Sequence, residues 1–463
     1  MSSLAHLALV AALPALVAAA TTDPGPRTDA PGAGLPLNGL TAEEQALFAA
    51  GQEAFEETNS VSGAPDEQGR PTDAGLGPRF NLDSCAGCHS QPATGGTSPG
   101  VNPQVAVATS LGARNAVPWF VAANGPVREA RFKKRPDGTD DGGVTNLFVI
   151  AGRADAGACD IAQPDFGPAG DPLTGQGGDP NLIFRIPTPL FGSGLIEAIA
   201  DSAIVANKAG QEPRKAALGI RGREGRSNRS PGAGGAVGQG SANRNGNDGT
   251  VTRFGWKAQN KSLLLFAGEA YNVEQGVTSE LFSNERDETP ACMMNPLPES
   301  GSAFTSDPDA ALPDIVKFAA FMRFLAPPEP APDTPSTISG GEQFATVGCA
   351  LCHTPSFTTA RTASAALSEK PVNLYSDLLL HRMGTGLADG IAQGSAGGDE
   401  FRTAPLWGIG QRLFFLHDGR TSDLVAAIQA HKSPGSEASG VVDRFNALPD
   451  AKQQDLLSFL RSR

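Results

Sequence analysis

The sequence predicts a mainly α-helical chain with extensive loops, built from two related domains of which the first is enlarged by insertions. One observation is the pentapeptide Cys-x-x-Cys-His, which occurs at residues 85–89 and again at 349–353. Another is a similar string after each copy, Pro-Leu-Phe-Gly-Ser-Gly at 189–194 and Pro-Leu-Trp-Gly-Ile-Gly at 405–410. Because the pentapeptide and the string that comes after it both occur twice, they indicate an internal duplication. The 56 glycines and 37 prolines among 463 residues are typical of a loop-rich chain.

Cys-x-x-Cys-His is the attachment signature of a c-type haem. Its two thiols form thioethers with the porphyrin, and the adjacent histidine ligates the iron. The alternatives are a zinc site, which needs four ligands from two half-sites, and a thioredoxin-like redox pair, which does not require the histidine. We therefore predict two covalently bound haem c groups in two cytochrome c-like haem domains. The attachment residues are Cys85, Cys88, Cys349 and Cys352, and the proximal iron ligands are His89 and His353.

Residues 1–20 contain an apolar run that ends in three alanines. This pattern is typical of a secretory signal peptide and is too short to span a bilayer, although an apolar N-terminal helix is an alternative. Because bacteria attach haem c outside the cytoplasm, we expect the mature protein in the periplasm. No later segment approaches 18 consecutive apolar residues, so we expect no membrane insertion. The net charge of −13 argues against a nucleic acid partner and permits a basic redox partner.

The elements follow in order along the chain. Residues 41–57 are predicted to form a helix, because a Thr-x-x-Glu capping box opens a run with helical spacing of apolar residues. A short helical stretch at 341–348 precedes the second pentapeptide in the same way. Apolar stripes with proline in the first turn predict closing helices at 312–325 and 448–460.

The proline-rich residues 327–335 predict a stiff, extended linker and therefore the domain boundary. We place the N-terminal haem domain at residues 37–328 and the C-terminal haem domain at 336–463. The arginine- and glycine-rich stretch from about 210 to 250 is predicted to be one of the insertions, as an exposed loop or a β-ribbon.

Two cysteines, Cys159 and Cys292, lie outside the pentapeptides. In an oxidising compartment two remaining thiols most often pair, so we favour a disulfide over two unlinked thiols. Closing so long a loop contributes on the order of 4–5 kcal/mol in the chain-entropy model.

The second axial position on each iron has few candidates. Once the signal peptide is removed, the remaining imidazoles are those of His381, His417 and His431. His431 ends a predicted helix at 424–430 and is the best-placed ligand, although a histidine there can equally be a core residue. Because no histidine lies between residues 90 and 352, we predict that the first haem lacks a strong sixth ligand. An open iron can bind peroxide or dioxygen.

Longer strings carry a family resemblance. They lie at residues 78–89, 194–199, 253–258, 377–381, 400–407 and 415–420, the last reading Phe-Leu-His-Asp-Gly-Arg. Through these strings the chain from about residue 40 to 463 resembles the bacterial di-haem oxidoreductases described as peroxidases or thiol oxidoreductases. These are relatives of di-haem cytochrome c peroxidase and of the di-haem enzyme that matures methylamine dehydrogenase.

The resemblance implies a role for each haem. In the relatives the C-terminal haem transfers electrons, and its distal ligand lies fourteen residues after the position of His417, which is His431 here. The relatives place methionine or tyrosine at that position, so this departure leaves the electron donor and the oxidant open. The N-terminal haem, with His89 as proximal ligand, is the catalytic one. Glu197 lies near the segment that supplies distal residues and is our candidate general base, or else a residue that caps or pairs on a helix.

Further expectations follow from the same resemblance. Calcium occurs at the domain interface of the relatives. We expect a small redox electron donor of the cytochrome or cupredoxin type, and a peroxide or another oxidant. Trp256 and Trp407 are candidates for relaying electrons between the haems, although buried tryptophans are mostly core residues.

We therefore predict a periplasmic di-haem c-type oxidoreductase, peroxidase-like, that passes electrons from the C-terminal haem to an open N-terminal haem. A di-haem electron-transfer cytochrome without a substrate is one alternative, and it requires two six-coordinate irons. A di-haem dioxygenase resembling the rubber-cleaving enzymes is another. The sequence does not name the substrate or the electron donor.

Overall fold

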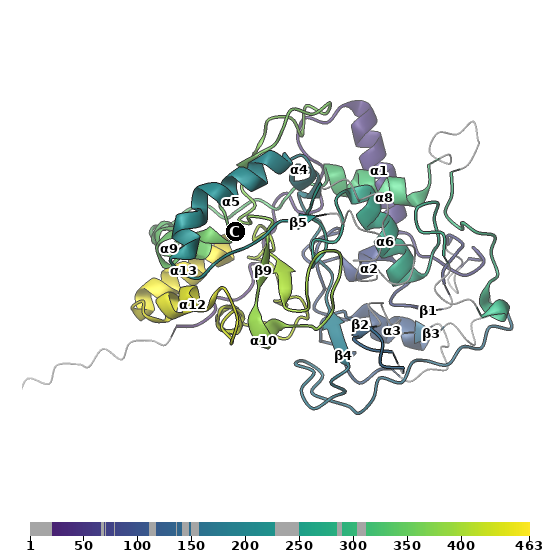
Figure 1. Ribbon diagram of the computed structural model, residues 1–463. Coiled ribbons are helices and arrows are strands. Elements are labelled where there is room, and N and C mark those ends of the chain that lie inside the picture. Colours follow the sequence, from purple (N-terminus) through teal and green to yellow (C-terminus); the bar gives the residue numbers. More distant parts are fainter. Residues whose placement is uncertain are drawn as a thin grey trace, which may run out of the picture.

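Helices joined by long loops dominate the molecule, with short two-stranded ribbons between them (Figure 1). The computed structural model describes residues 21–65, 69, 71–77, 79–110, 117–135, 137–140, 148–149, 157–226, 250–284, 289–302 and 312–463. The predicted signal peptide at 1–20 and residues 227–249 of the predicted insertion lie outside the described residues.

One group of helices surrounds the first pentapeptide. It consists of α1 (Ala42–Glu56), α6 (Leu263–Gln275) and α8 (Asp314–Phe324), and α8 packs against the other two. Helix α1 begins at the predicted capping box, in which Thr41 and Glu44 bind each other's main-chain amides. It crosses α8 at Gly51, where a Cβ atom would lie 2.3 Å from the carbonyl oxygen of Lys317. The helices predicted at 41–57 and 312–325 are confirmed.

A second group repeats this arrangement around the second pentapeptide. It contains α9 (Pro335–Val347), α11 (Leu424–Ala430), α12 (Ser439–Asn446) and α13 (Asp450–Ser462). Helix α9 crosses α13 at Gly340, where a Cβ atom would lie 2.0 Å from the carbonyl oxygen of Asp455. In each group the helix before a pentapeptide therefore crosses the group's last helix at a glycine. Figure 1 shows the two groups on opposite sides of the molecule.

The start of α9 differs from the prediction. The helix begins at Pro335, six residues before the predicted stretch at 341–348 and at the end of the predicted linker. Thr334 caps it, and a proline is well tolerated at the first helical position because its missing N–H would have no partner there. The helix predicted at 448–460 is confirmed as α13.

The other elements are short, apart from α5. The remaining helices are α2 (Cys85–Cys88), α3 (Pro103–Ser110), α4 (Ser193–Glu197), α5 (Asp201–Ala216), α10 (Gly384–Leu387), and the 3-10 turns η3 (Pro290–Cys292) and η4 (Cys349–Leu351). The antiparallel ribbons pair β1 (Arg79–Phe80) with β3 (Phe148–Val149), β2 (Glu129–Phe132) with β4 (Leu182–Arg185), β5 (Gly225–Arg226) with β6 (Val251–Thr252), β7 (Phe357–Thr358) with β8 (Pro371–Val372), and β9 (Leu380–Arg382) with β10 (Glu400–Arg402). The β5–β6 pair closes the base of the predicted insertion at 210–250, whose first residues instead belong to α5.

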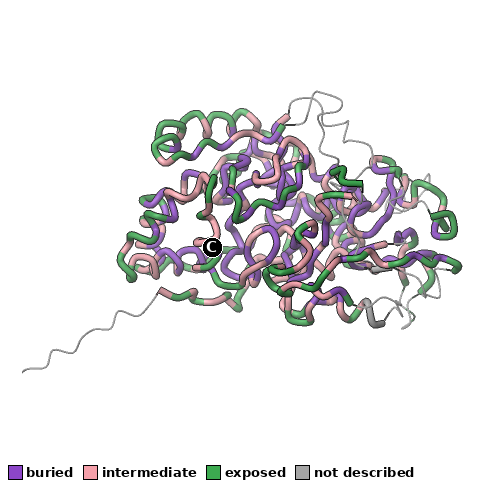
Figure 2. Tube along the Cα trace, turned by 60° about the horizontal axis from the view of Figure 1, so that its bottom comes forward, coloured by how far each residue is buried: buried purple, intermediate pink, exposed green. Residues whose placement is uncertain are grey.

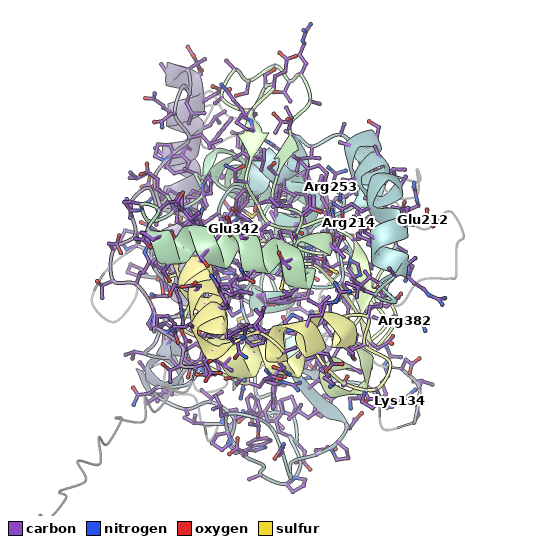
Figure 3. All side chains as sticks on the ribbon, turned by 90° about the vertical axis from the view of Figure 1, so that its left-hand side faces the viewer. Lys134, Glu212, Arg214, Arg253, Glu342 and Arg382 are labelled. Carbon is purple, nitrogen blue, oxygen red and sulfur yellow. A yellow bond between two sulfur atoms is a disulfide. The ribbon has the colours of Figure 1, made fainter. Side chains whose placement is uncertain are left out.

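Buried residues run through the centre of the molecule, and exposed ones lie on the outer turns of the helices (Figure 2). Charged side chains such as Lys134, Glu212 and Glu342 are exposed at the surface (Figure 3). Cys159 and Cys292 form a disulfide, the pairing favoured from the sequence. Among the described residues, we find no helix with the length and apolar character needed to cross a membrane.

Candidate active site

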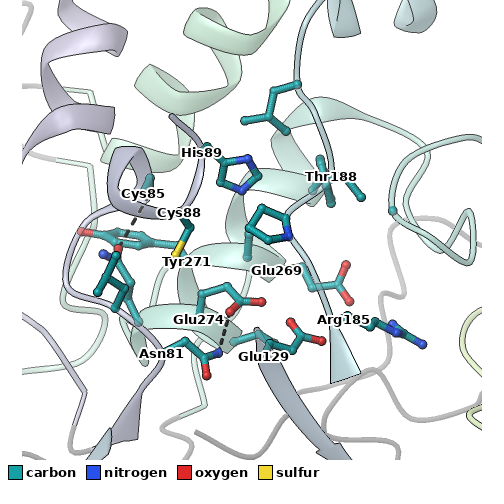
Figure 4. Close-up of a pocket in the computed structure, with 18 of the residues that line it drawn as sticks. Asn81, Cys85, Cys88, His89, Glu129, Arg185, Thr188, Glu269, Tyr271 and Glu274 are labelled. Atoms are coloured by element: carbon teal, nitrogen blue, oxygen red, sulfur yellow. Dashed lines mark hydrogen bonds between the residues drawn. The ribbon is translucent and has the colours of Figure 1, made fainter. Parts of the chain in front are cut away.

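A cavity of about 1130 Å³, including its open mouth, lies beside the first pentapeptide. Its walls come from α2, α6, α8, strand β2 and the segment that follows β4. Cys85, Cys88 and His89 line it together. Figure 4 shows these three residues on one side of the space, with the carboxylates of Glu129, Glu269 and Glu274 opposite.

The first pentapeptide has the local structure that haem attachment needs. Cys85 and Cys88 bound the single turn of α2, so both thiols lie on the same wall, and neither is in a disulfide. The imidazole Nδ1 of His89 donates to the carbonyl of Gly96 at 2.9 Å, which fixes the tautomer and orientation of the ring. Burial lowers the pKa of His89 to about 4, so the imidazole is neutral, as a ligand must be.

The second pentapeptide repeats these features. The thiols of Cys349 and Cys352 are also outside any disulfide. His353 donates from Nδ1 to the carbonyl of Tyr375 at 2.9 Å, and burial lowers its pKa to about 4. His431 stands at the end of α11, where its Nδ1 donates to the carbonyl of Ala427 at 2.7 Å. It is close enough to His353 for a charge on one ring to depress the pKa of the other.

These donor sets fit a haem at each pentapeptide. Each set has two unpaired thiols and a neutral imidazole that is held through Nδ1. Burial raises the pKa values of Cys85 and Cys349 to about 12, so both remain protonated and do not behave as reactive thiolates. Among the described residues there is no group of three or more histidine, cysteine, aspartate or glutamate side chains that could hold a metal ion. Calcium stays a prediction.

A buried carboxyl pair lies across the cavity from His89. Burial alone would raise the pKa of Glu129, but the charge of Arg131 and a hydrogen bond from Glu274 lower it to about 2. Burial and the negative charge of Glu129 raise the pKa of Glu274 well above its usual value. Asn81 donates to Glu274 at 2.6 Å. The surroundings therefore favour the ionised form of Glu129 and the protonated form of Glu274.

A third carboxyl, that of Glu269, connects the cavity to a wider polar network. It accepts from Asn260 and, at 3.0 Å, from the amide of Gln393, and burial raises its pKa. Gln393 in turn accepts from Arg185, whose other nitrogen pairs with Asp389 at 2.8 Å. Hydrogen bonds thus run from the cavity wall into the C-terminal half of the chain.

The position of Glu197 favours the second of its two sequence-based interpretations. Its carboxylate accepts from the main-chain amide of Leu263, the first residue of α6, and pairs with Arg323 at 2.8 Å. Glu197 is not among the residues that line the cavity. Its contacts with Leu263 and Arg323 match the alternative interpretation, in which Glu197 caps a helix and forms an ion pair.

Sequence reasoning missed Glu129, Glu269 and Glu274. The two last residues interrupt the otherwise apolar helix α6, and charges within such a helix are a signal that was available. Glu129 carried no comparable signal, because β2 has only four residues and the cavity is formed by segments far apart in the chain.

The two tryptophans and His417, which the sequence also singled out, do not lie together at one site. Trp256 lines the cavity and its ring lies 6.5 Å from that of His417, whereas Trp407 packs against Gly192. His417 stacks on Phe401 with ring centres 4.3 Å apart.

His381 is fixed by carboxylates beside the second pentapeptide. It lies between Asp377 and Glu437, at 3.0 and 2.8 Å, and 3.8 Å from the sulfur of Cys352. It is not among the residues that line the first cavity.

The family of the chain can now be stated. Residues 177–463 match the family model described as "Di-haem oxidoreductase, putative peroxidase". The chain therefore belongs to this family, which confirms the resemblance seen in the sequence.

Solved structures with partial similarity carry related descriptions. A MauG-like protein associated with microbial copper homeostasis is 20% identical, with 34% of this chain and 54% of that chain covered and a TM-score of 0.23. The diheme peroxidase BthA from Burkholderia thailandensis E264 is 16% identical, with 45% and 65% covered and a TM-score of 0.28. Hydrazine synthase of Kuenenia stuttgartiensis is 18% identical, with 34% and 56% covered and a TM-score of 0.22. The chain thus covers less than two thirds of each, and no curated protein matches it.

Proposed function

We propose that the protein is a periplasmic di-haem c-type oxidoreductase that reduces a peroxide in the cavity beside His89. One haem is attached to Cys85 and Cys88, and the second, attached to Cys349 and Cys352, supplies the electrons. His353 and His431 ligate the second iron. A small cytochrome or cupredoxin would be the electron donor.

The observation that carries the peroxide proposal is the pair of buried carboxyls, Glu129 and Glu274, that line the cavity of His89 and bind each other. Reduction of hydrogen peroxide consumes two electrons and two protons and yields two water molecules. A base must take the proton from the inner oxygen, and an acid must supply a proton to the outer oxygen so that water departs. Ionised Glu129 provides the acceptor and protonated Glu274 the donor. A bound haem would supply the iron that holds the peroxide and delivers electrons to it.

The first test compares two isosteric variants of this pair. Glu129→Gln removes the base and should slow the reaction with hydrogen peroxide by about 10²–10⁴-fold. Glu274→Gln keeps a hydrogen-bond donor to Glu129 but has no proton to give to the outer oxygen, so it should slow the reaction by a similar factor at neutral pH. Stopped-flow absorbance of the haem reports both rates. Equal rates in all three proteins would remove the pair from the mechanism.

The state of the first iron separates an enzyme from an electron carrier. The ferric protein should show a high-spin signal in low-temperature electron paramagnetic resonance, and hydrogen peroxide should abolish it. Two low-spin signals that peroxide leaves unchanged, before and after one-electron reduction, would instead indicate a di-haem electron-transfer cytochrome. Such a carrier has no use for a buried proton donor and acceptor, which is why we favour the enzyme.

A further inference from the structure

Two buried arginines have no anionic partner in the described part of the chain. Arg402 and Arg412 are 9% and 6% exposed. Arg402 donates only to carbonyls, to that of Gly255 at 3.0 Å and that of Thr403 at 3.4 Å. The guanidinium of Arg412 makes no hydrogen bond and no ion pair with any described residue. Burial lowers the pKa of each to about 10, and the charge of Arg412 contributes to the lowering at Arg402.

The lack of a carboxylate partner sets these two arginines apart from most other buried cations among the described residues. Six of them pair with a carboxylate: Arg131 with Glu129, Arg185 and Lys257 with Asp389, Lys215 with Asp377, Arg253 with Asp201, and Arg461 with Asp23. Arg128 donates to the carbonyls of Pro172, Leu173 and Asp418. Two neighbouring guanidinium ions without an anion are strongly unfavourable in a protein interior. Their position therefore calls for a negatively charged group outside the described residues.

Arg402 lies between the wall of the first cavity and the segment that holds His353. Its main-chain amide and Nε donate to the carbonyls of Trp256 and Gly255, which line the cavity of His89. The carbonyl of the next residue, Thr403, accepts from Ser376 at 2.6 Å. Ser376 follows Tyr375, whose carbonyl binds His353.

Arg412 lies beside the first pentapeptide. The carbonyl of the preceding residue, Gln411, accepts from the side chain of Gln91 at 3.1 Å. Gln91 is two residues beyond His89. The positive charge of Arg412 lowers the pKa of Arg402, as expected for two guanidinium groups in one region of the structure. The pair therefore stands at the junction of the two haem sites.

We propose that Arg402 and Arg412 bind haem propionate at this junction and raise the reduction potential of the haem that carries it. A propionate is a carboxylate on the haem itself, and the planar guanidinium binds carboxylates in a bidentate fashion. A nearby positive charge favours the reduced iron over the oxidised iron because reduction removes one unit of positive charge. The proposal rests on the proposed function, in that it requires two haem c groups.

The test measures the midpoint potentials of both haems in Arg402→Met and Arg412→Met by spectroelectrochemistry. Each variant should favour the oxidised form of one haem by about tenfold, because one charge is lost at short range. That factor corresponds to about 59 mV for a one-electron couple. Arg402→Lys and Arg412→Lys keep the charge and should stay closer to the unmodified protein. Arg361→Met removes an exposed charge and should have almost no effect, because solvent screens it.

Three outcomes would count against the proposal. Unmoved potentials in variants that carry two haems would overturn the propionate assignment and leave the proposed function intact. Potentials of the unmodified protein that change with chloride or phosphate at constant ionic strength would identify a free anion instead. Fewer than two haem c groups per chain, counted as pyridine haemochrome, would overturn the proposed function and this assignment together.

If the methionine variants do not fold, the lysine variants still give an answer. Redox-difference infrared spectra of protein carrying ¹³C-labelled haem propionates should show carboxylate bands that shift in Arg412→Lys. Identical bands in the variant and the unmodified protein would overturn the assignment.

Discussion

At the scale of single residues, the cavity separates the pKa values of two adjacent carboxyls. Glu129 and Glu274 are both buried, and the difference between them comes from their neighbours. Arg131 stabilises the ionised form of Glu129, and the resulting charge on Glu129 keeps the proton on Glu274. A pair with opposite protonation states can both accept and donate a proton without help from solvent.

This separation predicts an alkaline limit to activity. Because the pKa of Glu274 is raised, its proton is present at neutral pH and is lost only as the pH rises through that higher value. The rate with hydrogen peroxide should then fall, since the donor is gone and a second negative charge stands beside Glu129. Glu274→Gln has no donor at any pH and cannot ionise, so its lower rate should stay flat over the same range. Stopped-flow rates from pH 6 to 10 check this prediction. If the rate of the variant also falls at alkaline pH, the ionisation of another group causes the fall.

The sequence predicted the cysteines and the histidine of the site, but it did not predict the carboxyls that line the cavity. The pentapeptides are local, so spacing alone was enough to select Cys85, Cys88 and His89, and the structure gathers them on one cavity. Glu197 was chosen because it lies near a family segment, but nearness along the chain does not determine which wall a side chain faces. The charges in α6 were a better guide, because a carboxyl within an apolar helix needs a partner or a function.

At the scale of elements, Glu197 is part of the start of α6. Its carboxylate binds the amide of Leu263, one of the helix-start amides without an intrahelical partner, and Ser262 binds that of Leu265. A negative charge is also favourable at this end of the helix dipole.

We therefore expect Glu197 to affect stability and not chemistry. Glu197→Gln should lower the free energy of unfolding by about 1 kcal/mol, because it removes the helix-end charge and a partly exposed ion pair with Arg323. Urea unfolding measures this change, and Arg323→Gln is the matched control that removes the same pair from the other side. The peroxide rate of Glu197→Gln should equal that of the unmodified protein. A large loss of rate at full folding would restore Glu197 as a catalytic candidate.

Helix-start signals made some of the long helices predictable, whereas α5 and α6 were missed although Ser262 caps α6. The capping box at Thr41 starts α1 as expected, and the prolines expected in the first turns of the closing helices, Pro313 and Pro449, stand at the N-caps of α8 and α13. The start of α9 was missed because Pro335 was read as part of a linker, although proline also suits a helix start. Strands of two to four residues, such as β1 and β2, have too few positions for a recognisable alternation.

At the scale of the whole molecule, the beginning of the described chain is tied to its end. Asp23 binds Arg461 of α13 through both carboxylate oxygens, at 2.7 and 2.6 Å, and also accepts from the amide of Leu424 at 2.8 Å. Arg27 donates from its main chain to the carbonyl of Gly410. Farther along, Leu37 donates to the carbonyl of Phe324 in α8. Residues 23–37 therefore contact both helix groups, although the predicted N-terminal domain begins only at residue 37.

This contact predicts a large effect from a residue near the start of the described chain. The side chains of Asp23 and Arg461 are 8% and 4% exposed, so Asp23→Ala leaves a buried guanidinium without its carboxylate. Breaking a buried ion pair from one side costs about 3–5 kcal/mol, and we expect a loss in that range. Asp29→Ala removes an exposed partner of Arg27 and should leave the free energy of unfolding almost unchanged.

The dependence on pH gives an independent check of the same contact. Burial alone would raise the pKa of Asp23, but the hydrogen bonds from Arg461, Gly25 and Leu424 lower it below its usual value. A lowered carboxyl pKa stabilises the folded state above the unfolded value of about 3.9, and that stabilisation is lost as the pH falls through the folded value. The difference in unfolding free energy between Asp23→Ala and the unmodified protein should thus be constant from pH 5 to 7 and shrink below about pH 4. A difference that does not change with pH would mean that packing, and not the ion pair, joins the two ends of the chain.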